Sequence, residues 1–288
     1  ELLPGLNAVF GVEYGEVSDE HAPLFDVENS DRAFEEEVLF TGFGTAPVKG
    51  EGAAVSYDDA QESYTARYTH ETVALGFAIT EEAMEDNLYD TFAKLRAKGL
   101  ARAMANTKQV KAAHAGGDGD ALFSASHATI GDGDQSNLLS AADLSEASLE
   151  TALISISKIK DDRGILIGAQ AESLHIPSDL AFTADQILNS ALSTTIVSNS
   201  GVTNTNDINS IRNQGLVPGG FYVNRRFTDT NAFFIKTDCP NGAKMFVRSP
   251  LQTKMEPDFD TGNLRFKARE RYSFGWSDWR GFFGNAGA

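Results

Sequence analysis

The sequence contains very little cysteine and no long hydrophobic run. Cys239 is the only cysteine among 288 residues, so no disulfide can form within the chain. The longest uninterrupted apolar run is the four-residue segment 232–235, whereas a membrane-spanning helix needs about 20 apolar residues. The sequence therefore predicts no contact with a membrane, and the lack of a disulfide framework fits a reducing compartment.

The common catalytic signatures are also missing. No G-x-S-x-G, H-E-x-x-H or C-x-x-C motif occurs, and the dipeptide Gly-Lys of a Walker loop never appears. The stretch GFGTAP begins like a dinucleotide-binding loop at Gly42 and Gly44, but Pro47 and the absence of a following helix favour a turn. The five histidines are scattered, which favours structural roles over metal binding. The sequence therefore predicts neither an enzyme nor a cofactor.

Negative charge is abundant and unevenly placed. The formal net charge is −17. Residues 1–90 contain 21 acidic and 3 basic side chains, whereas residues 91–288 contain 20 acidic and 21 basic ones. Two interpretations are compatible with this asymmetry: a solvated acidic surface, or an acidic front that docks on less acidic surfaces, including other copies of the chain.

Basic residues concentrate in a strictly alternating stretch near the C-terminus. One set of alternate positions is Phe266, Ala268, Glu270, Tyr272, Phe274 and Trp276, and the other begins Arg265, Lys267, Arg269 and Arg271. A period of two is typical of a strand with one buried face. Nucleic-acid binding is disfavoured, because base stacking needs exposed aromatic side chains and these are predicted to be buried. We expect a core strand whose basic outer face meets acidic partners.

The first 78 residues contain two segments that lack a core of their own. Residues 1–35 include a stretch that predicts a short helix, but their few apolar side chains must pack on another surface to become ordered. Residues 36–78 predict two strands around a long excursion that contains Pro47, Gly50 and Gly52. A lone two-stranded ribbon is marginal in water. We therefore expect both segments to gain their order by clasping neighbouring copies.

Residues 79–115 predict one long helix. Thr80 is a plausible N-cap, acidic residues crowd the first turns and basic residues the later ones, which suits the helix dipole. The expected apolar face comprises Met84, Leu88, Phe92, Leu95 and Ala103. A helix of this length spans roughly 50 Å and would serve as a spine.

The remaining chain predicts a loop region and an inserted α/β subdomain. Residues 116–145 read as loops, and residues 146–260 alternate helices with short strands. Within them, residues 198–209 predict a polar loop and residues 244–250 a short strand. The Asp-Gly pairs of the loop region offer carboxylates to Ca²⁺, although they do not match an EF-hand and are common turn formers. These carboxylates belong to Asp118, Asp120, Asp132 and Asp134.

Three stretches of the sequence resemble a known family. Residues 121–153, residues 160–167 (KDDRGILI) and residues 257–284 resemble the major capsid protein of tailed bacteriophages, in particular the phage Mu-type major head subunit branch. The resemblance implies an α+β, Hong Kong 97-like capsid fold with a long spine helix. Its implied parts are an N-terminal arm (1–35), an extended β-hairpin loop (36–78), a peripheral domain (79–145 and 252–288) and an inserted α/β axial domain (146–251).

The resemblance also implies a function and its partners. Copies of the chain would form pentamers and hexamers of an icosahedral shell that encloses double-stranded DNA, with non-specific contact to the DNA. The shell would be assembled in the bacterial host cytoplasm and would form the virion capsid, with scaffolding, portal and decoration proteins as further partners. An encapsulin-like compartment remains an alternative, and a Ca-dependent hydrolase or surface protein is the alternative from another class.

Candidate residues for contacts between subunits follow from the charge pattern and the resemblance together. Acidic residues of a neighbour's arm or loop are expected to meet the basic face of the C-terminal strand. Lys49 lies near the predicted loop tip, where some family members cross-link a lysine to a neighbour's asparagine, but no partner asparagine or catalytic acid can be assigned. The full set of candidates is Glu35, Glu36, Glu37, Lys49, Glu51, Asp58, Asp59, Arg265, Lys267, Arg269 and Arg271.

Overall fold

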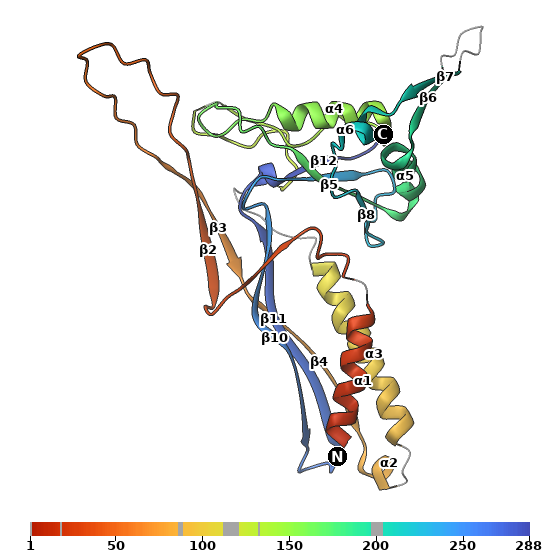
Figure 1. Cartoon of the computed structure of the whole chain (residues 1–288). Helices are drawn as coiled ribbons and strands as arrows, with labels where there is room; N and C mark the ends of the chain where they lie inside the picture. The colour runs from red at the N-terminus through yellow and green to blue at the C-terminus, as the bar shows by residue number, and fades with distance from the viewer. Residues whose placement is uncertain (1, 18, 86–88, 112–120, 132, 197–203) are drawn as a thin grey trace. The chain divides into compact units, whose positions relative to one another are not determined.

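A computed structural model describes residues 2–17, 19–85, 89–111, 121–131, 133–196 and 204–288. The chain divides into two compact units, and each is described by itself (Figure 1). Unit 1 comprises residues 1–36, 67–115 and 244–275. Unit 2 comprises residues 37–66, 116–243 and 276–288. The last residues of the chain, 276–288, cluster with unit 2.

Unit 1 is built on a four-stranded sheet. Its strands, in spatial order, are β1 (Asp26–Asn29), β10 (Ala243–Pro257), β11 (Leu264–Trp276) and β4 (Glu71–Ile79). Strand β1 runs parallel to β10, and β11 runs antiparallel to β4 with Phe266 opposite Phe77. The predicted alternation is confirmed, because Phe266 and Ala268 are buried whereas Arg265 and Lys267 are exposed.

Helices cover one face of this sheet. The helix α1 (Leu2–Glu16) lies beside α3 (Tyr89–Lys111), and the short α2 (Glu81–Glu85) precedes α3 (Figure 1). Leu6 and Phe10 of α1 are each only 2% exposed and join α3 and the sheet in one hydrophobic core. The helix expected in residues 1–35 is confirmed, but it packs on its own chain. The prediction that this arm needs a neighbouring copy for its order is therefore wrong for α1.

The long helix is confirmed over 89–111, while residues 86–88 and 112–115 lie outside the described residues. The Thr80 hydroxyl accepts the backbone N–H of Ala83 at 3.4 Å, as an N-cap does. Leu95, predicted on the apolar face, is exposed, and the side chains of Met84, Leu88 and Phe92 are not described. The buried face of α3 is formed by Ala93, Ala97, Leu100, Ala101 and Met104. Its small alanines allow α1 to approach closely.

Unit 2 contains a second four-stranded sheet. Its strands, in spatial order, are β12 (Phe282–Asn285), β9 (Phe233–Thr237), β5 (Ala171–Ile176) and β8 (Phe221–Val223). Only the β5–β8 pair is parallel. The helices are α4 (Glu146–Ser157), α5 (Ala181–Asn189) and α6 (Ser210–Gln214), and 3-10 turns span Ser178–Leu180 and Trp279–Gly281. The predicted N-cap of α4 is confirmed, because Ser145 accepts the backbone N–H of Ser148.

Two segments of the predicted subdomain have a different structure. Residues 198–209 were expected to form a polar loop, but β6 (Leu192–Ile196) and β7 (Asn204–Ile208) form an antiparallel hairpin around residues 197–203, which are not described. The asparagines of β7 have low strand propensity, and backbone pairing with β6 overrides that preference. Residues 244–250, expected to be a separate strand of the subdomain, are the first part of β10 in unit 1.

The predicted ribbon with a long excursion is confirmed. Strands β2 (Phe34–Phe40) and β3 (Glu62–Thr69) pair with each other, and residues 42–60 extend beyond their ends (Figure 1). Thr41 and Gln61 close the ribbon, since the backbone N–H of Thr41 donates to the Gln61 carbonyl at 2.8 Å and the N–H of Gln61 donates to the Thr41 hydroxyl at 3.0 Å. A turn near the tip has Gly52 at a φ of 74°, a left-handed conformation that suits glycine.

Candidate inter-subunit surfaces

The loop of residues 42–60 exposes large apolar side chains. Tyr57 is 96% exposed, Val48 is fully exposed, and Phe43 and Val55 are exposed as well. Single exposed apolar side chains are common on monomers, but a group of them on one loop is typical of an interaction surface. This loop is therefore the first candidate contact surface.

The base of the same loop is held by its own chain. The Asp58 carboxylate accepts the backbone N–H of Gly44 at 2.7 Å. Arg163 donates to Asp58 at 3.4 Å and to the backbone carbonyl of Asp59 at 2.9 Å. The hydrogen bond from Gly44, aided by the charge of Arg163, lowers the pKa of Asp58. Asp58, a predicted contact residue, is thus already bound within its own subunit.

Three further predicted acids are also bound within the chain. All three lie on β2. Glu35 accepts the hydroxyl of Ser30 at 2.7 Å, and Glu36 lies 3.7 Å from Arg67 Nε. Glu37 accepts the hydroxyl of Ser277. Their charges are therefore less available to a neighbour than the sequence alone indicates. At the loop, by contrast, Lys49, Glu51 and the carboxylate of Asp59 are exposed and make no ion pair among the described residues.

The basic residues of β11 form one row on the face of the sheet opposite the helices, and all but the last of them are exposed. Arg265 is paired with Asp258 of its own chain. Lys267 and Arg269 are exposed and make no hydrogen bond or ion pair with the described residues. Arg271 is half-buried, and its Nε has no hydrogen-bond partner in the described part of the chain. Lys267 and Arg269 are therefore the positions of the predicted row without an ion pair in the described part of the chain, although Lys254 and, beside it, Lys267 lower the pKa of Glu256.

Small side chains on the neighbouring strand β4 lie next to this row. Thr72, Ala74, Gly76 and Ala78 lie opposite the four basic residues in the strand register. A Cβ on Gly76 would lie 2.7 Å from the Phe266 carbonyl oxygen, so the close approach of the two backbones requires glycine there. This face of the sheet therefore carries small side chains along β4 and positive charge along β11. Such a surface suits an extended acidic segment.

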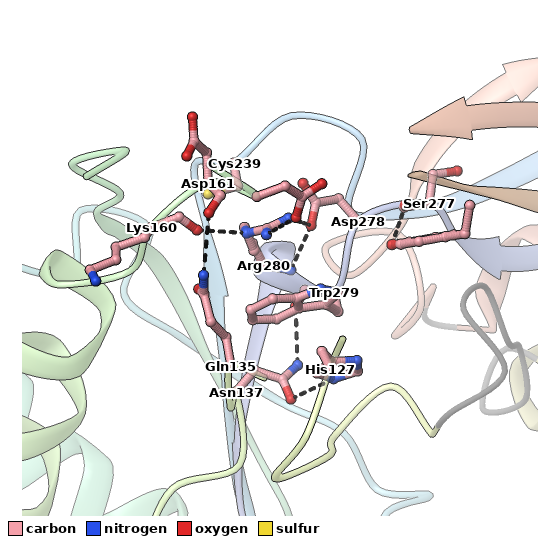
Figure 2. A network of polar contacts seen from close by, with 12 residues as sticks. His127, Gln135, Asn137, Lys160, Asp161, Cys239, Ser277, Asp278, Trp279 and Arg280 are labelled. Atoms are coloured by element: carbon pink, nitrogen blue, oxygen red, sulfur yellow. Dashed lines mark hydrogen bonds and ion pairs between the residues drawn. The ribbon is translucent and has the colours of Figure 1, made fainter. Parts of the chain in front are cut away.

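The sequence reasoning did not find a buried ionic network at the C-terminal end. Arg280 is almost fully buried and donates to Asp162 at 2.5 Å, to Asp278 at 3.3 Å and to the backbone carbonyl of Lys160 at 2.9 Å (Figure 2). The two carboxylates raise the pKa of Arg280, against the effect of burial. A guanidinium surrounded by these acceptors fixes the chain end in unit 2. The only sequence signal is the clustering of charged and aromatic residues in SDWR.

The same network continues through an aromatic stack. The Trp279 ring lies under the guanidinium of Arg280 and stacks on His127 with ring centroids 4.5 Å apart (Figure 2). Asn137 bonds His127 at 3.1 Å and donates to the Trp279 carbonyl at 3.1 Å. These contacts give His127 a structural role, as predicted for the histidines. His114 lies outside the described residues.

Metal and membrane sites are not found in the described part of the chain. No group of three or more His, Cys, Asp or Glu side chains is placed to hold a metal ion there, while Asp118, Asp120 and Asp132 lie outside that part. None of the described helices is both long and apolar enough to cross a bilayer.

A family model for phage capsid proteins matches residues 63–285, which is more than half of the chain. The chain therefore belongs to the phage capsid protein family. A search of curated proteins found no match.

Solved structures with the same fold cover almost the whole chain. The capsid of Myoviridae phage XM1 is 12% identical, with a TM-score of 0.56 over 95% of this chain and 93% of that one. The capsid of an empty GTA particle is 13% identical, with a TM-score of 0.56 over 92% and 88% of the two chains. A virus-like particle from Pyrococcus furiosus is 12% identical, with a TM-score of 0.54 over 99% of both chains.

Fold and family together define a shell protein. The predicted Hong Kong 97-like fold is confirmed, and with it the function of a phage major capsid protein, a structural component of the virion capsid. The encapsulin-like alternative is less well supported, because the family model is that of phage capsids and the likeness to the virus-like particle shows the fold alone. The narrower assignment to the phage Mu-type branch stays a prediction.

Proposed function

We propose that this chain assembles through pentamers and hexamers into an icosahedral shell around double-stranded DNA, in the cytoplasm of a bacterial host. The observation that carries the proposal is that one chain has two exposed surfaces of complementary character. One is the apolar and acidic loop of residues 42–60, and the other is the basic outer face of β11 with the small side chains of β4. Surfaces that are complementary within one sequence permit head-to-tail contacts, which close into rings.

The extended loop is a better source of acids for the basic face than the arm helix. Helix α1 is buried against its own α3, and its Glu13 is bound to Arg102 and Lys98. The loop leaves Glu51 and the Asp59 carboxylate exposed. We therefore assign Lys267 and Arg269 as the positions that receive these two acids from a neighbouring copy.

The peripheral and axial domains of the resemblance correspond in this proposal to the body of unit 1 and the body of unit 2. Scaffolding, portal and decoration proteins would be further partners. Contact with packaged DNA would be non-specific and weak, because a chain with a net charge of −17 repels phosphates overall. The role requires no catalytic step and no cofactor.

Charge reversal of the basic row tests the proposal. Each exposed ion pair contributes about 0–1 kcal/mol, but the contact is repeated at every subunit, so Lys267→Glu combined with Arg269→Glu should strongly reduce particle yield. The readouts are sedimentation and negative-stain electron microscopy. Lys158→Glu combined with Arg212→Glu, which changes the net charge equally in unit 2, is the matched control. Normal particles from the Lys267/Arg269 variant would remove the basic row from the interface.

A second measurement separates the shell function from this particular contact. The wild-type protein should form uniform closed particles or rings of five or six subunits. A wild-type protein that stays monomeric at high concentration would contradict the shell function itself, whatever the variants do.

A further inference from the structure

His70 occupies a position where four segments of unit 1 meet. It lies between the end of β3 and the start of β4, which is the point where the ribbon joins the sheet. Its ring Nε2 is 2.8 Å from the hydroxyl of Ser30, directly after β1, and its Nδ1 is 2.9 Å from the hydroxyl of Ser273 on β11. Glu35, at the start of β2, is 2.7 Å from the Ser30 hydroxyl. All four side chains belong to unit 1.

The number of available protons fixes the direction of these hydrogen bonds. An ionised carboxylate only accepts, so Ser30 donates its single hydroxyl proton to Glu35. The Ser30 oxygen then accepts from the backbone N–H of Arg32 at 3.2 Å and from His70 Nε2. The proton of the neutral ring is therefore on Nε2, and Nδ1 accepts the Ser273 hydroxyl proton.

Protonation of the ring would disturb this arrangement. An imidazolium would present a second N–H to Ser273, whose hydroxyl would have to turn away and find another acceptor. The charged groups that act on the ring are Arg271 from β11, Arg248 from β10 and Glu35 from β2. Burial lowers the pKa of His70, the two arginines lower it further, and Glu35 acts in the opposite direction.

We propose that His70 is a proton-operated joint that holds the base of the β2–β3 ribbon to the sheet at neutral pH and releases it on acidification. The folded-state pKa lies below the unfolded value of about 6.5, so the joint contributes stability above that pH. The contribution is lost as the pH falls from there through the lower folded-state pKa. The four segments that share the ring would then separate, and the ribbon would change its attachment without unfolding of the helix-covered core.

Hydrogen exchange of the whole 288-residue chain, corrected for the intrinsic effect of pH on exchange, tests the joint. In the wild type, amides of residues 30–36 and 67–70 should lose protection in one step below about pH 6.5, while amides of α3 keep theirs. His70→Gln keeps a donor for Ser30 and cannot be protonated in this range, so the step should disappear. His21→Gln, at another buried histidine of unit 1, is the matched control and should keep the step.

Two further variants keep the test decisive if His70→Gln does not fold. Arg271→Gln removes a positive charge beside the ring, so the midpoint of the step should move to higher pH. Glu35→Gln removes the negative charge and should move the midpoint to lower pH. A step that persists in His70→Gln, or that stays at the same pH in both charge variants, overturns the proposal. The readout uses only unit 1, so its outcome is independent of whether particles form.

Discussion

Helix α1 and the loop of residues 42–60 lie in the same acidic third of the chain, but they differ in what they bury. Helix α1 inserts Leu6 and Phe10 into the core of unit 1. The loop leaves Val48 and Tyr57 in solvent, although its base is fixed by hydrogen bonds. Helix α1 is thus part of the subunit's own stability, whereas the loop tip is available for contacts with other molecules.

The largest effect is expected from Phe10→Ala. A large-to-small change at a fully buried aromatic residue costs about 3–5 kcal/mol, and the Phe10 ring also contacts the rings of Tyr14 and Phe266. The free energy of unfolding of the unassembled subunit, measured by urea denaturation, should fall by that amount. Val12→Ala, at an exposed position of the same helix, is the control and should change little. Equal effects of the two substitutions would show that α1 is not docked on its own chain.

An intermediate effect is expected from Glu13→Gln. Glu13 is buried on α1 and binds the exposed side chains of Arg102 and Lys98 of α3. A hydrogen bond to a charged group contributes about 1.5–3 kcal/mol, and the amide would keep part of it, so the loss should be about 1 kcal/mol. Thermal or urea unfolding measures it, with Glu16→Gln at an exposed site as the control. A loss as large as that of Phe10→Ala would mean that charge rather than apolar burial anchors the helix.

The smallest effect on subunit stability is expected from the double variant Val48→Ser and Tyr57→Ser. Both side chains are exposed, so the free energy of unfolding should stay within about 0.5 kcal/mol of the wild type. Particle yield, measured by sedimentation, should nevertheless fall sharply, because the apolar area that a neighbour covers is removed. Unchanged particle yield would contradict the role of the loop.

The sequence predicted the elements whose pattern is regular. The alternation of residues 265–276 is visible without any partner, because a strand buried on one face must alternate. The excursion of residues 42–60 is also evident, since Pro47 and the glycines interrupt strand pairing. The capsid fold itself came from the resemblance rather than from periodicity.

The docking of α1 was missed because its apolar side chains seemed too few for a core. Leu6 and Phe10 suffice because they enter a surface already prepared by Ala97, Ala101 and Met104 of α3. Alanines do not stand out in a hydrophobicity pattern, so only the half-buried Ala103 was predicted on this face, and Leu95 was predicted to be buried although it is exposed. A surface of this kind depends on the tertiary arrangement and leaves no local signal.

The candidate contact residues were predicted by charge, and charge alone does not show which acids are already paired. Glu35 and Asp58 read like any exposed acid in the sequence, but Ser30 and Arg163 bind them within the subunit. The network of Arg280 and Asp162 joins residues 118 positions apart in the chain, which no local spacing rule connects. Distant polar partners of this kind are known only once the fold is known.

The closure of the unit 1 core within a single chain has a consequence for how copies associate. Because Leu6 and Phe10 complete that core without a second molecule, the body of unit 1 can reach its final conformation before copies associate. Association then joins subunits that are already folded, so the conformational entropy lost on association is small and arises mainly at the loop. Intertwined oligomers differ, because their chains fold only as they associate. Such joining is reversible at each single contact, so a misplaced copy can leave before the growing structure closes around it.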